Sequence, residues 1–152
     1  MHDLLVFLHL AGVIVWVGGM FFAHVCLRPV AAAQLPPPQR LPLLAGVLAR
    51  FFVAVTVAIA AILASGLALM ATAGVARAPL HWHLMMTGGL VMAGIFALIA
   101  VHFFPRLRRG VAAADWPAAG AAMNRIRQLV AANLLLGALT VAVATLGAGF
   151  AG

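Results

Sequence analysis

Six histidines are the side chains of this chain best suited to bind a metal ion or a cofactor. Three lie near the amino terminus and three in one later segment: His2, His9, His24, His81, His83 and His102. Residues 79–89 read PLHWHLMMTGG, so two imidazoles flank a tryptophan and two methionines follow closely. Imidazole binds haem iron and copper, and thioethers bind Cu(I). The histidines therefore direct attention to metal and haem chemistry.

Other chemistries find little support among the polar residues. The two acids, Asp3 and Asp115, fall in distant parts of the sequence, so they predict no carboxylate pair. The sequence also shows no nucleophile with a matching base and no phosphate-binding loop, which argues against hydrolysis and phosphoryl transfer. No catalytic residue is assigned from the sequence.

The elements that must position the histidines are four long apolar runs. Of the 152 residues, 66% are hydrophobic and 7% are charged, and the mean hydropathy is +1.20, a composition unlike that of soluble domains. A helix of roughly 20 apolar residues crosses a bilayer. We therefore predict an all-α integral membrane protein, a four-transmembrane-helix bundle that forms a single membrane domain over residues 1–152. The predicted helices cover about 4–27, 43–75, 80–105 and 117–150.

The nine arginines predict how the bundle is oriented. Eight lie in or beside the connections between the first and second runs and between the third and fourth, and Arg77 alone lies on the other side. The positive-inside rule places these connections in the cytoplasm and both termini outside, in a bacterial inner membrane. Because the net charge of +7 serves topology, the expected partner is the lipid bilayer and not nucleic acid. Glycine-rich helix faces leave a homodimer open.

The first apolar run carries two histidines on one side. At 100° per residue, His9, Trp16, Met20 and His24 fall within about 80° of one another. Ionisable side chains inside a bilayer are costly and by default mark function. This stripe predicts a surface that faces a cofactor, with Trp16 and Met20 lining the pocket.

The third apolar run begins and ends with histidines. Because the first and third helices cross in the same direction, His9 shares an outer level with His81 and His83, and His24 shares an inner level with His102. His81 and His83 point almost oppositely on a helix, so only one of them can face the first helix.

Paired imidazoles on facing helices are the arrangement that holds haem iron in a bundle. We expect one haem b at the outer level, with His9 and His83 as axial ligands, His81 as a substitute and Arg77 available to pair with a propionate. Two imidazole ligands leave no open iron position, which favours electron transfer with an unidentified redox partner. A membrane oxidoreductase of the b-type haem kind stays open.

A second haem between His24 and His102 is the less favoured arrangement. His9 and His24 are roughly 22 Å apart along a helix axis, whereas His83 and His102 are roughly 28 Å apart. Simpler roles also stay open: His24 and His102 lie near arginines at the interface, where they can hydrogen-bond headgroups, and His9 can be satisfied by a neighbouring carbonyl.

Copper is the competing cofactor. His2, His81, His83 and Met85 offer imidazole and thioether ligands on the outer side, a combination that suits Cu(I). In this alternative the protein handles copper and contains no haem.

Three segments resemble a known family. Residues 7–24 (FLHLAGVIVWVGGMFFAH), 78–109 (APLHWHLMMTGGLVMAGIFALIAVHFFPRLRR) and 115–144 (DWPAAGAAMNRIRQLVAANLLLGALTVAVA) look like the CopD-family small integral membrane proteins. That resemblance implies copper resistance and copper transfer across the inner membrane.

The chain is also similar to the HemJ-type protoporphyrinogen oxidases, four-helix membrane proteins that bind haem b. Their early histidine is matched by His9, and their H-x-K pair by His81 and His83, with histidine in place of lysine. This similarity implies haem binding, and it makes a HemJ-like oxidase a third alternative.

Overall fold

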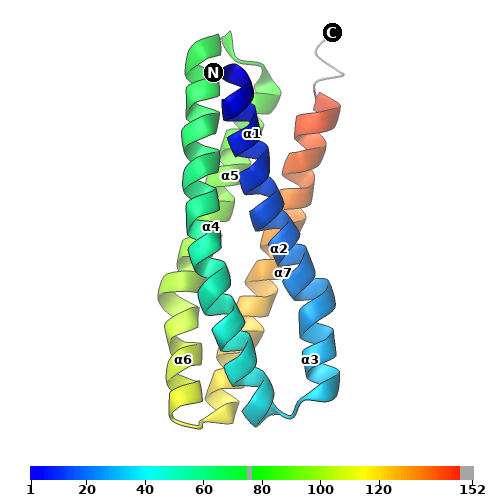
Figure 1. Ribbon diagram of the computed structural model, residues 1–152, viewed down its shortest axis with the longest axis vertical. Coiled ribbons are helices and arrows are strands. Elements are labelled where there is room, and N and C mark those ends of the chain that lie inside the picture. The colour runs from blue at the N-terminus through cyan, green and yellow to red at the C-terminus, as the bar shows by residue number, and fades with distance from the viewer. Residues whose placement is uncertain (75–76, 148–152) are drawn as a thin grey trace.

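The structure, a computed structural model, describes residues 1–74 and 77–147. Within these residues four long helices lie side by side along the length of the molecule (Figure 1). They cover His2–Gln34, Pro37–Ala73, Leu80–Ala112 and Trp116–Leu146, and each is long and apolar enough to cross a membrane. The predicted all-α fold with four membrane spans is confirmed.

Two of the four long helices contain π-helical turns. The first consists of α1 (His2–Val13), η1 (Ile14–Gly18), α2 (Gly19–Phe21), η2 (Phe22–Leu27) and α3 (Arg28–Gln34). The third consists of α5 (Leu80–Leu98), η4 (Ile99–Phe103) and α6 (Phe104–Ala112). The second and fourth are α4 (Pro37–Ala73) and α7 (Trp116–Leu146). A π-helical turn is wider than an α-helical one, so faces computed at 100° per residue drift after each of these segments.

The helices extend beyond the apolar runs at several ends. The second begins at Pro37. Proline is suited to the first turn of a helix, because an N–H at that position has no acceptor within the helix. The third continues past Pro105 to Ala112, with Pro105 in the first turn of α6. The fourth begins after Asp115, whose side chain accepts a hydrogen bond from the Ala118 N–H at 3.0 Å. The predicted ends at 75 and 150 lie outside the described residues.

The helices pack as two pairs that meet along the bundle. Helix α1 runs along α4, and α5 runs along α7. At the end of the bundle away from α1, α6 contacts both α7 and α4. At Gly12 a Cβ would lie 2.7 Å from Ile62 Cγ1 and 3.0 Å from the carbonyl oxygen of Ala58, so α1 approaches the α4 backbone closely. This contact requires glycine.

The outer surface of the bundle is apolar. Large side chains such as Phe7, Ile14, Val53 and Val101 are more than half exposed. In a membrane protein this surface is covered by lipid, so the bilayer surrounds the chain. The α3–α4 and α6–α7 connections lie together at one end, and the amino terminus lies at the other (Figure 1). We call the end with these two connections the arginine-rich end.

Candidate functional site

His9 is held by helix α4 through one ring nitrogen. Its Nδ1 lies 3.1 Å from the carbonyl oxygen of Ile62 and 3.1 Å from the Ser65 hydroxyl oxygen. A carbonyl oxygen only accepts hydrogen bonds, so this contact assigns the proton to Nδ1 in the neutral imidazole. Nε2 then carries a free lone pair, which is the form of histidine that binds metals.

Ser65 reinforces this orientation. The Ser65 hydroxyl donates to the carbonyl oxygen of Ala61 at 2.6 Å, which leaves its oxygen to accept from His9. Ser65 is only 2% exposed, so water does not compete for these bonds. A backbone or side-chain acceptor on the second ring nitrogen is the usual support of a metal-binding histidine.

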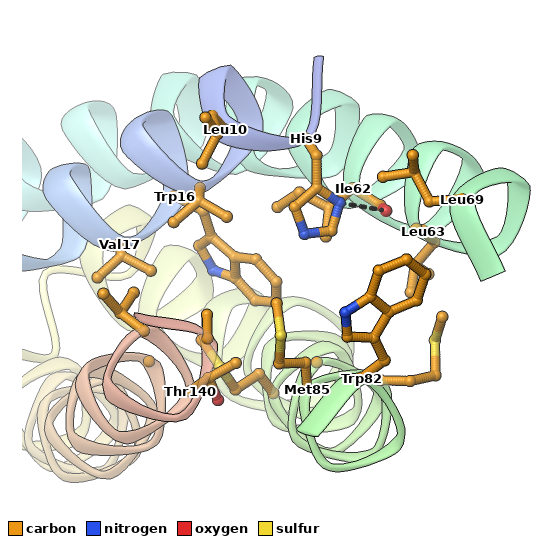
Figure 2. A pocket seen from close by; sticks show the side chains of 18 of the residues that line it. His9, Leu10, Trp16, Val17, Ile62, Leu63, Leu69, Trp82, Met85 and Thr140 are labelled. Carbon is orange, nitrogen blue, oxygen red and sulfur yellow. Dashed lines mark hydrogen bonds between the residues drawn. The ribbon is translucent and has the colours of Figure 1, made fainter. Parts of the chain in front are cut away.

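The other edge of the His9 ring faces a cavity of about 360 Å³ (Figure 2). This cavity lies between the α1–α4 pair and the α5–α7 pair, and its lining is largely apolar. Besides His9, its sulfur-bearing and aromatic residues come from η1, α4 and α5: Trp16, Met70, Trp82, Met85, Met86 and Met92. Across the cavity from His9, Met85 and Trp82 point toward the imidazole (Figure 2).

Gly66 makes room for two of the potential ligands. A Cβ at this position would lie 3.3 Å from His9 Cε1 and 3.6 Å from Met86 Cε. The imidazole and the end of the Met86 side chain therefore approach the same point on α4. The absence of a side chain at Gly66 lets both lie there.

Of the three histidines predicted at the outer level, His9 borders the cavity, and His81 and His83 do not. From α5 the cavity is lined by Trp82, Met85, Met86, Gly89 and Met92. His81 packs toward α7, because a Cβ at Gly147 would lie 2.9 Å from His81 Cβ. Trp82, the residue between His81 and His83, lines the cavity where one of these two histidines was predicted to lie.

Trp16, predicted to line a haem pocket, and Met85, predicted as a ligand in the copper alternative, both border the cavity. Met20 is buried with Trp16 in the same apolar cluster but does not border the cavity. The π-helical turn η1 between His9 and Met20 shifts Met20 away from the predicted stripe. Arg77 is exposed and does not border the cavity either.

The remaining histidines lie apart from the cavity. His24 and His102 occupy the π-helical segments η2 and η4, and the His102 ring lies edge-on to Phe103 with the centroids 5.0 Å apart. His2 is exposed, with its Nδ1 3.5 Å from Asp3 Oδ1. In residues 1–74 and 77–147 no three His, Cys, Asp or Glu side chains gather as a metal site. The predicted copper set of His2, His81, His83 and Met85 is not brought together in this cavity.

Comparison with known families adds an independent observation. The family model described as copper resistance protein D, CopD, matches residues 45–146. The chain belongs to the CopD family. The resemblance to this family seen in the sequence is thereby confirmed, and the match connects the protein with copper resistance. Searches of the curated proteins and of the solved structures returned no match.

The matched region of this CopD-family protein contains most of the cavity. It includes Ser65, Gly66, Met85 and Met86, whereas His9 precedes it. His9 and Met85 were candidates from the sequence, whereas Ser65, Gly66 and Trp82 were not. The dipeptide Ser65-Gly66 inside an otherwise apolar run was the signal that could have pointed to a polar contact there.

Chemically, the cavity offers the CopD-family protein one neutral imidazole nitrogen and several thioethers, with no carboxylate among its lining residues. Hard cations such as Mg²⁺ and Ca²⁺ prefer oxygen ligands, whereas thioether and imidazole suit Cu(I). The donor set therefore fits a soft monovalent ion.

Proposed function

We propose that this CopD-family protein handles copper in the membrane and binds Cu(I), as cargo, in the cavity beside His9. The observation that carries the proposal is the orientation of His9: α4 holds Nδ1, and the free Nε2 faces a cavity lined by methionines. Family membership supports the same metal, because the matched family is described by copper resistance.

The proposed ligands are His9 Nε2 and the thioethers of Met85 and Met86. Met85 points toward His9 across the cavity (Figure 2). The end of the Met86 side chain lies beside Gly66, as the His9 ring does. All three donors are neutral, so the bound ion keeps its single positive charge. A monovalent ion costs less to place in an apolar cavity than a divalent one, because the solvation cost rises steeply with charge.

Haem b is a second candidate, favoured by the size of the cavity. About 360 Å³ is more than one ion needs and falls within the roughly 300–1,000 Å³ typical of small-molecule sites. His9 would supply an axial imidazole, and Met85 stands where a thioether ligand could complete the pair. The volume is near the lower end of that range, so a whole macrocycle requires the α1–α4 and α5–α7 pairs to separate further. Electron transfer belongs to this second candidate.

One preparation can separate the two candidates. The full chain is purified in detergent after expression with ample copper and haem supply, and both copper content and the reduced-minus-oxidised visible spectrum are measured. The proposal predicts about one Cu(I) per chain, with no b-type absorption band. A sharp b-type band without copper would replace the copper proposal by the haem candidate.

A further inference from the structure

A second hollow lies at the arginine-rich end, between α6 and the first half of α7. It measures about 650 Å³ and is bordered by three arginines, Arg106 and Arg109 from α6 and Arg125 from α7. All three side chains are exposed. This hollow, which we call the basic groove, is separate from the cavity beside His9, and neither hollow shares a lining residue with the other.

Small residues between α6 and α7 form the groove, because they let the two helices approach closely and leave space beside the contact. A Cβ at Gly110 would lie 2.8 Å from the backbone nitrogen of Ala119, so α6 and α7 touch there through their backbones. Four alanines also line the groove, together with Phe103 and Asp115: Ala113, Ala118, Ala121 and Ala122. Short side chains leave space above this contact, and the arginines surround that space.

Among the described residues, none of the three guanidinium groups forms an ion pair with a carboxylate. The ion pair found there joins His2 and Asp3. Arg125 Nη1 donates to Gln128 Oε1 and Arg109 Nε to the Pro105 carbonyl oxygen, each at 3.4 Å. Asp115 also lines the groove, and its Oδ1 accepts a hydrogen bond from the Ala118 N–H. Each guanidinium has five N–H donors, so most of them are free for an anion.

The groove lies beside the end of the apolar surface of the third long helix. Phe103, which lines one end of the groove, lies near the end of the apolar part of the third long helix, and the exposed Val101 and Leu98 precede it in the sequence. The groove extends from Phe103 to Ala113, roughly 15 Å at 1.5 Å per residue. It therefore spans the level where lipid headgroups meet the apolar surface of the bundle.

We propose that the basic groove binds the headgroup of a phospholipid that carries two phosphates, of the cardiolipin class. The three guanidinium groups and the Asp115 carboxylate give the lining of the groove a net charge of +2, which matches two phosphate charges, and arginine binds phosphate oxygens in a bidentate manner. The acyl chains lie along the exposed apolar side chains beyond Phe103. The positive-inside rule predicts that this end faces the cytoplasm, where anionic lipids of the inner leaflet are available. The proposal does not depend on copper binding.

The test is native mass spectrometry of the full chain in detergent with equal amounts of cardiolipin, phosphatidylglycerol and phosphatidylcholine. We expect the wild-type protein to retain cardiolipin at least tenfold over phosphatidylcholine. The triple variant R106Q/R109Q/R125Q is expected to lose this preference. The matched control, R28Q/R40Q/R50Q, removes the same charge from the α3–α4 side of the same end and is expected to keep it.

Three results would overturn the proposal. The first is equal retention of phosphatidylcholine and cardiolipin by the wild-type protein, which needs no variant. The second is an equal loss in both triple variants, which would indicate unspecific attraction by net charge. The third is displacement of the lipid by inorganic phosphate at matched concentration, which would identify free phosphate as the occupant. If the glutamine triple variant does not fold, R125Q alone replaces it, with R50Q as its control and the same opposed expectations.

Discussion

The Nδ1 of His9 lies 3.1 Å from the carbonyl oxygen of Ile62, across the contact between α1 and α4. This bond satisfies one ring nitrogen and turns the other toward the cavity. His9 can therefore donate to the carbonyl oxygen and bind a metal ion at the same time, because each role uses a different nitrogen of the ring.

Replacing His9 by alanine should remove the nitrogen ligand of the proposed site. We expect the affinity for Cu(I), measured anaerobically against a chromophoric chelator, to fall at least 100-fold. His102→Ala is the control, because His102 is exposed and does not border the cavity. Equal affinities for the wild-type protein and His9→Ala would show that copper binds elsewhere.

Ser65→Ala should weaken copper binding without removing a ligand. The change deletes the hydroxyl oxygen 3.1 Å from His9 Nδ1 and leaves the Ile62 carbonyl in place. We expect a loss of about tenfold in Cu(I) affinity, at the lower end of the effects of such supporting contacts. In the control Thr56→Ala, the lost hydroxyl bonds only to the carbonyl of Phe52 on the same helix. A Ser65→Ala variant with unchanged affinity would mean that Ser65 does not orient the imidazole for binding.

The double change Met85→Leu and Met86→Leu tests the thioether ligands. Leucine nearly conserves the volume of methionine, so each change should cost less than about 1.5 kcal/mol of stability. The Cu(I) affinity should nevertheless fall by tenfold or more, because leucine carries no sulfur donor. Met123→Leu is the matched control, since Met123 packs against the other apolar cluster. Full affinity in the double variant would exclude these thioethers as ligands.

Gly12→Ala should separate α1 from α4. The added Cβ would meet Ile62 Cγ1 at 2.7 Å and the Ala58 carbonyl oxygen at 3.0 Å, so the helices must shift, at a cost of about 1–3 kcal/mol. We expect a lower midpoint of thermal unfolding in detergent and weaker copper binding, because the shift also moves the carbonyl that holds His9. Gly18→Ala meets nothing within 4 Å and should not lower the midpoint. Identical midpoints for the two variants would contradict the close contact at Gly12.

The sequence predicts the number of helices better than it predicts their faces. Four apolar runs required four spans, and His9 and Trp16, which the sequence placed on one stripe, both border the cavity. Met20, placed on the same stripe, does not border the cavity, because the π-helical turn at Ile14–Gly18 changes the angle per residue and no residue pattern indicates such a turn.

The partners of His9 were harder to predict, because they depend on how α5 is rotated about its own axis. The HWH segment suggested that His81 or His83 would face His9, yet Trp82 occupies that direction. The contact between His9 and Ile62 joins residues 53 positions apart and uses a backbone carbonyl. A side-chain pattern cannot indicate which carbonyl lies opposite, so the packing of α1 on α4 was needed to find it.

X-ray absorption at the copper K-edge of the Cu(I)-loaded protein tests the central proposal most directly. The proposed site predicts a first coordination shell of one nitrogen from His9 and two sulfurs from Met85 and Met86, with the nitrogen lost in His9→Ala. A first shell of nitrogen or oxygen alone, unchanged in His9→Ala, would contradict a copper site in this cavity.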